Sequence, residues 1–156
     1  MNIVTRLTDV LELHGARLRA LIGHSIEVAR VVWYRPWDTL HAASPVVIRV
    51  AGVNLELWSI YVAEFGFTWE VLDLSRPPFY WVDRPDADSD WVEAPFLPLK
   101  RAVGRVIHRV RLMPADDLCS GVEFTFDSWS LTLYTELDEL IITDEPLRFE
   151  PLWVDV

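Results

Sequence analysis

Two segments of the chain carry the same pattern, and this repeat constrains the fold more than any other feature. Residues 21–32 read LIGHSIEVARVV, and residues 102–113 read AVGRVIHRVRLM. Three pairs of identical residues lie 81 positions apart: Gly23/Gly104, Ile26/Ile107 and Arg30/Arg111. The repeat predicts two halves with equivalent structures.

The similarity continues downstream at an offset of 76 positions, so the intervening loop is shorter in the second half. Five apolar positions match in order: Val46/Val122, Ile48/Phe124, Val50/Phe126, Leu55/Leu131 and Leu57/Leu133. Two copies are too few for a solenoid, so we expect one domain over residues 1–156 with a pseudo-twofold duplication. Its halves would span about 21–74 and 99–145. Chance similarity is the alternative, because alternating apolar residues are common in sheets.

The spacing of apolar residues predicts an α+β fold in which an N-terminal helix packs on a mainly antiparallel sheet. The helix would run from about Val4 to Leu21, with His14 on its apolar stripe as a packing residue. Strands are expected at 25–34, 46–50, 55–58 and 68–72 in the first half and at 105–113, 122–126, 131–134 and 140–143 in the second. We expect a turn or bulge near Glu27 and near its counterpart, a hairpin turn at Ala51-Gly52, a helical or turn entry at 99–103 and a loop at 114–121.

Prolines mark residues 75–98 as the connection between the halves, since repeated proline cannot hold a regular interior strand. The many aromatic residues of this segment predict that it packs across the surface and contributes to recognition. The tail from Pro146 to Val156 is apolar at several positions and is expected to dock on the body.

Composition limits the class of protein. With 156 residues, 51% of them hydrophobic, the chain can bury a core. The single Cys119 excludes an internal disulfide framework, and we find no secretory signal and no apolar run of membrane-spanning length. We therefore expect a soluble cytoplasmic protein.

The formal charge of −10 is unevenly placed. Residues 1–115 hold 13 acidic and 13 basic side chains, whereas residues 116–156 hold 11 acidic and 1 basic. This segregation argues against nucleic acid and anionic membranes as partners and favours a basic protein. Simple solubility is the alternative explanation.

The candidate partner-binding residues are the carboxylates of the acidic segment: Asp116, Asp117, Glu136, Asp138, Glu139, Asp144 and Glu145. A run of opposite sign comprises Lys100, Arg101, Arg105, Arg109 and Arg111. We expect these cations to pair with the acidic half or to support self-association into a homodimer.

Motifs for catalysis or cofactor binding fit the sequence poorly. Residues 86–90 begin like a calcium loop, but Trp91 and Leu97 stand where that loop needs Gly and Glu. Acidic neighbours disfavour a thiolate at Cys119, and the four histidines lack metal-ligand spacing. We therefore expect no catalytic residue, no metal and no cofactor, and we lean towards a protein that is not an enzyme.

An alternative site uses aromatic side chains. Five tryptophans would line a pocket between the halves and make the protein a small-ligand binder or an enzyme: Trp33, Trp37, Trp58, Trp81 and Trp91. Ordinary packing in the core and at interfaces is the competing explanation for these residues.

The pattern Leu21-x-Gly23-x-x-Ile26 precedes a paired hairpin, and the second half carries residues 124–126 (FTF) and 131–134 (LTLY). This arrangement resembles small uncharacterised bacterial domains with duplicated L-x-G-x-x-I strand units, some of which are proposed immunity proteins of polymorphic toxin systems. The resemblance implies a non-enzymatic inhibitor that covers a basic active site, such as that of a nuclease, with its acidic face.

Overall fold

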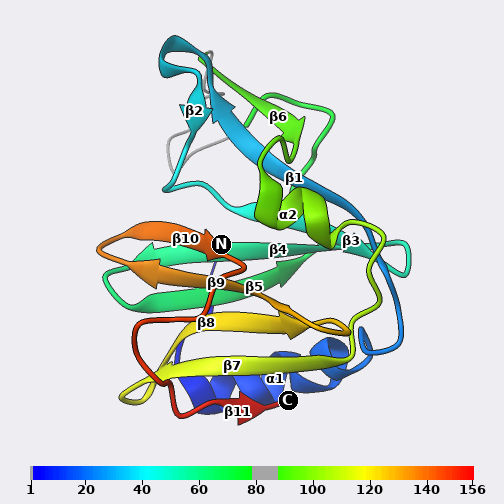
Figure 1. Ribbon diagram of the computed structural model, residues 1–156. Helices are drawn as coiled ribbons and strands as arrows, with labels where there is room; N and C mark the ends of the chain where they lie inside the picture. The colour runs from blue at the N-terminus through cyan, green and yellow to red at the C-terminus, as the bar shows by residue number, and fades with distance from the viewer. Residues whose placement is uncertain (1, 79–87) are drawn as a thin grey trace.

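The computed structural model describes residues 2–78 and 88–156, and it has the predicted α+β fold (Figure 1). One N-terminal helix accompanies two antiparallel sheets. In chain order the elements are α1 (Leu7–Arg19), β1 (Ile26–Tyr34), η1 (Arg35–Trp37), β2 (Thr39–Leu40), β3 (Val46–Val50), β4 (Val53–Tyr61), β5 (Glu64–Trp69), β6 (Ser89–Glu93), α2 (Leu97–Ala102), β7 (Arg109–Ala115), β8 (Leu118–Thr125), β9 (Ser130–Glu136), β10 (Glu139–Thr143) and β11 (Val154–Asp155).

Helix α1 buries the face that the apolar spacing predicted, including Val10, His14 and Leu18. It begins later than expected because the preceding residues are extended and pair with β8. Arg6 forms an isolated bridge with Leu118, and the Cys119 N–H donates to the carbonyl of Thr5 at 2.7 Å. The N-terminal segment therefore satisfies backbone groups of the second half.

Each half contains a four-stranded antiparallel meander. The first sheet has the order β2-β1-β3-β4-β5, with β6 also pairing with β1, and the second has the order β10-β9-β8-β7-β11. Strands β1, β3, β4 and β5 thus match β7, β8, β9 and β10 in order and in pairing. Descent of the two halves from one duplicated unit stays a prediction.

The two repeated segments cross each other and exchange equivalent hydrogen bonds. The Gly23 N–H donates to the Ile107 carbonyl at 2.8 Å, and the Gly104 N–H donates to the Ile26 carbonyl at 2.7 Å. Both glycines have positive φ, 90° and 84°, which L-residues with a side chain rarely adopt. The repeated glycine therefore permits the crossing that joins the two sheets.

The matched apolar positions are all buried, as the repeat predicted. Their exposures lie between 0% and 3% in both halves. They belong to one hydrophobic cluster that also takes in α1, through Val10 and Leu18, and α2, through Leu99 and Ala102. The core is thus shared by both halves.

The tight turn between β3 and β4 is also as expected. Val50 pairs with Val53, and the intervening Ala51 and Gly52 have φ of 51° and 74°, the conformation of a two-residue hairpin whose twist suits the strands. A second tight turn, at Leu137 and Asp138 between paired Glu136 and Glu139, joins β9 to β10 and also has positive φ at both positions.

The strand expected at 68–72 lies earlier in the chain, as β5 at Glu64–Trp69. Strand β5 ends at Trp69 because Glu70 has φ of 56° and turns the chain. The N–H groups of Val71 and Leu72 then donate to the Glu56 carboxylate at 2.8 and 2.9 Å instead of pairing with a strand.

The predicted loop at 114–121 was wrong. Residues there extend β7 and β8, and only Asp116 and Asp117 form the turn. A bulge between Met113 and Pro114 places the proline within the ladder. The bulge expected near Glu27 is present between Ile26 and Val28, whereas its counterpart near His108 is absent, since β7 begins only at Arg109 and pairs regularly from there to Met113.

The connection at 75–98 contains one strand that the sequence did not predict. Strand β6 pairs antiparallel with β1 over Ser89–Glu93. Asp90, from the motif that resembles a calcium loop, forms an ion pair with Arg35 at 2.6 Å. Asp86 of that motif lies outside the described residues.

Candidate functional site

The outer face of the second sheet carries a row of polar side chains that crosses four strands. Cross-strand pairing aligns Arg111 on β7, Glu123 on β8, Thr132 on β9 and Thr143 on β10. Residues at alternate positions, such as Leu131 and Leu133 on β9, point into the core. The period of two therefore places a polar row directly above the hydrophobic core.

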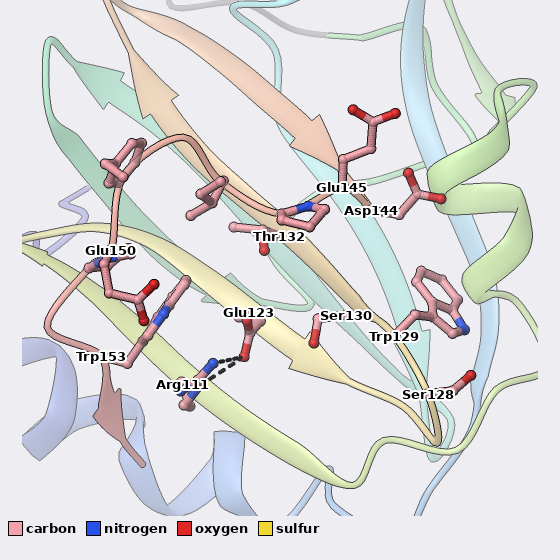
Figure 2. Close-up of a pocket in the computed structure, with 14 residues that line it drawn as sticks. Arg111, Glu123, Ser128, Trp129, Ser130, Thr132, Asp144, Glu145, Glu150 and Trp153 are labelled. Atoms are coloured by element: carbon pink, nitrogen blue, oxygen red, sulfur yellow. Dashed lines mark hydrogen bonds and ion pairs between the residues drawn. The ribbon is translucent and has the colours of Figure 1, made fainter.

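The C-terminal segment 144–153, which we call the strap, arches over this face and encloses a groove of about 430 Å³ (Figure 2). The sheet supplies the floor, with Arg111, Glu123 and Thr132 among the lining residues. Trp129 and Trp153 lie at opposite ends of the groove in Figure 2. The volume falls within the roughly 300–1,000 Å³ range of ligand pockets.

Glu123 is the buried carboxylate of the floor, with 7% of its surface exposed. Its Oε1 accepts hydrogen bonds from Arg111 Nε at 2.8 Å and Thr125 Oγ1 at 3.1 Å, and Arg111 Nη2 lies 2.7 Å away. Within the described ranges, no donor contacts Oε2. Thr132, the cross-strand neighbour, is only 4% exposed, and its hydroxyl has no partner among those same residues.

The strap is anchored at its far end by β11. Asp155 pairs with Arg111 in the ladder, and its carboxylate accepts hydrogen bonds from Arg109 Nε at 2.7 Å and Nη2 at 2.9 Å. These bonds lower the pKa of Asp155 below its ordinary value. The Arg111 guanidinium lies 4.8 Å from the ring centroid of Trp153. The docking of the tail that its apolar residues predicted is confirmed.

A glycine supports the middle of the strap. Gly121 pairs with Tyr134, and a Cβ built on Gly121 would lie 2.6 Å from both the Leu133 carbonyl oxygen and Tyr134 Cβ. Tyr134 therefore occupies the space above the glycine. Phe149 of the strap packs edge-on against Tyr134, with ring centroids 6.1 Å apart. Gly121 thus allows the aromatic contact that holds the strap on the sheet.

The predicted acidic residues fall into two groups at opposite ends of this sheet. The β7–β8 turn, with Asp116 and Asp117, and the β9–β10 turn lie at one end, because successive antiparallel strands alternate in direction. Asp117 forms an exposed ion pair with Arg6 at 3.5 Å. At the other end, Asp144 pairs with Arg101 at 3.2 Å, and exposed Glu145 lines the groove.

The β9–β10 turn lies against the equivalent turn of the first sheet. Thr135 Oγ1 donates to the Glu64 carbonyl at 3.0 Å, which joins the end of β9 to the start of β5. The two turns together expose three apolar side chains: Tyr61 at 64%, Val62 at 60% and Leu137 at 76%.

Three carboxylates surround this apolar group. Glu136, Asp138 and Glu139 are exposed, and within the part of the chain that the structure describes none of them forms an ion pair. We call the six residues Tyr61, Val62, Glu136, Leu137, Asp138 and Glu139 the tip surface. It combines apolar side chains with uncompensated negative charge.

The four predicted tryptophans that the structure describes do not gather into one pocket. Trp58 is buried and donates from Nε1 to Thr68 Oγ1 at 2.7 Å, and Trp33 donates to Asp38 Oδ1 at 2.9 Å. Trp91 lies on β6, paired with Val32 of β1. Trp81 falls outside the described residues.

Trp37, by contrast, is 79% exposed and lines a hollow of about 440 Å³ between the halves. Tyr34, residues 39–43 and Glu139 form the rest of its lining. The Leu140 N–H donates to the Ala42 carbonyl at 2.8 Å beside it. Only one of the four described candidate tryptophans therefore reaches this hollow.

The basic run is divided among several acidic partners. Arg101 pairs with Asp144 and lies 4.1 Å from the Trp129 centroid, while Arg109 and Arg111 bind Asp155 and Glu123. Pairing with the acidic half thus accounts for three of the five cations. Lys100 and Arg105 are exposed.

The nucleophilic and imidazole side chains do not converge. Burial raises the pKa of the Cys119 thiol to about 12. His14 accepts a hydrogen bond at Nδ1 from Trp69 Nε1 at 3.1 Å, and burial lowers its pKa. Across residues 2–78 and 88–156, no cluster of three or more His, Cys, Asp or Glu is arranged to hold a metal ion, and no helix is long and apolar enough to cross a membrane.

Sequence reasoning did not identify the groove. The sequence feature that could have indicated it is a set of polar residues at every second position of two facing strands. Glu123 and Thr125 on one strand pair with Thr132 and Ser130 on the other strand of the same predicted hairpin. Comparison of the chain with protein-family models, with curated proteins and with solved structures found no match.

Proposed function

We propose that this protein is a non-enzymatic binding module that holds a basic protein through the acidic surface of its second half, in the manner of an immunity-type inhibitor. The tip surface is the observation that carries the proposal. Exposed Tyr61, Val62 and Leu137 offer apolar contact, and the adjoining carboxylates have no cation partner among the described residues. An interface with an apolar centre and a charged rim has this composition.

The electrostatics of the whole chain support the same reading. A field from uncompensated carboxylates accelerates encounter with a cationic partner and disfavours nucleic acid and anionic membranes. At the groove end of the sheet, internal carboxylates are neutralised by Arg101, Arg109 and Arg111. The carboxylates of the tip surface have no such cation among the described residues, so the tip is the more strongly anionic surface for a partner. Cytoplasmic location and the absence of a cofactor belong to this proposal.

The test is capture of partners from lysate of the native host on three immobilised baits. The first is the wild-type chain, and the second carries Glu136→Gln, Asp138→Asn and Glu139→Gln. The third carries Asp9→Asn, Glu12→Gln and Glu93→Gln, which remove the same charge from exposed positions outside the second half. Proteins are eluted by stepping the salt and identified by mass.

We expect a basic protein on the wild-type and control baits that is released as salt rises. Three exposed ion pairs at about 0.5 kcal/mol each correspond to roughly tenfold weaker binding by the tip variant. Capture of no protein at any salt, or equal retention by the tip variant, would contradict the proposal.

A second candidate function is small-ligand binding or catalysis in the hollow between the halves. The exposed indole of Trp37, beside Tyr34, His41 and Glu139, favours it. A thermal-shift screen of small molecules on the wild type and on Trp37→Ala tests this candidate. A compound that stabilises the wild type but not Trp37→Ala would support this candidate function. Failure of every compound to stabilise the wild type would rule it out.

A further inference from the structure

The groove under the strap has the properties of a built binding site that the proposed function does not yet use. Its floor holds two nearly buried polar groups that lack partners among the described residues: the Oε2 atom of Glu123 and the hydroxyl of Thr132. Neither atom belongs to the fully buried side-chain atoms without a partner, which among the described residues are Asn54 Oδ1 and Ser59 Oγ, so both open onto the groove. A ligand in the groove can therefore bond them in place of water.

The charge of the lining selects the class of ligand. Of the four carboxylates in the lining, Glu123 pairs with Arg111 and Asp144 pairs with Arg101, which leaves Glu145 and Glu150 without a cation among the described residues. An ionised carboxylate only accepts hydrogen bonds, and this excess of negative charge disfavours phosphates and carboxylic acids. The groove therefore suits a cation that donates several hydrogen bonds.

Geometry favours a guanidinium over an ammonium group. Glu123 and Thr132 are direct cross-strand neighbours, so their side chains start about 5 Å apart. A planar guanidinium has five donors in a fixed fork and can bond two acceptors at such a spacing. The tryptophan rings of the groove already carry arginines of this chain, Arg111 on Trp153 and Arg101 on Trp129, so the two acceptors of the floor select the ligand.

We propose that the groove receives an arginine side chain, whose guanidinium binds Glu123 Oε2 and the Thr132 hydroxyl. This inference rests on the proposed function, since the arginine would belong to the basic partner. A neighbouring hollow of about 320 Å³ shares Glu145, Leu147 and Phe149 with the groove, and Glu136 of the tip surface is among its lining residues.

The test uses N-acetyl-arginine-N-methylamide as the probe, titrated into the full chain at low salt. Binding is read from the indole and backbone amide signals in NMR spectra. The neutral isostere N-acetyl-citrulline-N-methylamide is the matched ligand control. For a ligand of this size we expect a dissociation constant of about 1 mM or tighter, with the citrulline compound at least about tenfold weaker.

Two variants test the floor. Glu123→Gln removes the charge and is expected to weaken probe binding at least about tenfold, and Thr132→Val, which keeps the shape of the side chain, about threefold or more. Because Glu123→Gln also disturbs Arg111, Thr132→Val provides the cleaner measurement. Glu12→Gln, an exposed change of equal charge on α1, should bind the probe as the wild type does.

No binding of the arginine probe, equal affinity for the citrulline compound, or unchanged binding by both floor variants would overturn the inference. Its failure can be distinguished from failure of the proposed function. If the probe binds but no basic protein is captured, the arginine site is supported and the protein-binding function is refuted. If wild-type and Thr132→Val baits capture a basic protein equally and the probe does not bind, only the arginine site is refuted.

Discussion

Replacing glycine by alanine should change stability in opposite directions at two positions of this chain. Gly104 has φ of 84°, and Gly15 lies within α1. A Cβ built at either position meets no atom within 4 Å, so steric clash plays no part in either replacement. The difference between them is therefore one of backbone conformation alone.

The expected magnitudes follow from that conformation. A residue with a side chain in the left-handed region costs about 1–2 kcal/mol, and alanine recovers about 0.4–1 kcal/mol by restricting the unfolded chain. Gly104→Ala should therefore lower the free energy of unfolding by about 1 kcal/mol. Gly15→Ala should raise it by about 0.5–1 kcal/mol, because alanine is the better helix former.

Urea denaturation followed by tryptophan fluorescence measures both changes. We expect the midpoints to move in opposite directions with an unchanged dependence on urea concentration, which would indicate that only stability changed. In thermal unfolding, each kcal/mol corresponds to about 2–4 °C for a chain of this size. A Gly104→Ala protein as stable as the wild type would refute the view that this glycine holds the crossing of the two repeats.

Three further outcomes are expected. Cys119, whose pKa burial raises to about 12, should react with a thiol reagent at pH 8 only after denaturation, and rapid reaction of the native protein would contradict its burial. Burial lowers the pKa of His14 in the folded protein, so the unfolded chain takes up the proton at a higher pH than the folded protein does. The free energy of unfolding should therefore fall as pH drops through about 6.5. Urea titrations at several pH values should show a weaker pH dependence for His14→Gln than for the wild type. Gly121→Ala should lower the free energy of unfolding by about 1–3 kcal/mol, because the added Cβ meets the Leu133 carbonyl. It should also loosen the strap, which faster amide exchange over residues 145–149 would show. Unchanged exchange there would contradict the contact between Tyr134 and Phe149.

The core and the hairpins could be predicted from sequence because they depend on local alternation. Leu55 and Leu57, like Leu131 and Leu133, follow a period of two, and Ala51-Gly52 is a turn signal by itself. The loop expected at 114–121 failed because Pro114 and Gly121 are read as turn residues. Tertiary structure instead accommodates Pro114 in a bulge and covers Gly121 with Tyr134.

The site was predicted only in part, for a different physical reason. The acidic residues are visible in the sequence, but their division between the tip and the groove end depends on which strand ends lie together. The groove exists because the strap folds back and β11 pairs with β7. No local pattern encodes that long-range pairing, so Glu123 and Thr132 gave no signal beyond polar alternation.

Binding of a basic protein at the tip surface is best tested by hydrogen–deuterium exchange of this protein alone and in complex with the captured partner. We expect slower exchange at the β4–β5 and β9–β10 turns, residues 61–64 and 136–139, when the partner is bound. Protection confined to the first half away from these turns, with no change at the tip surface, would contradict it.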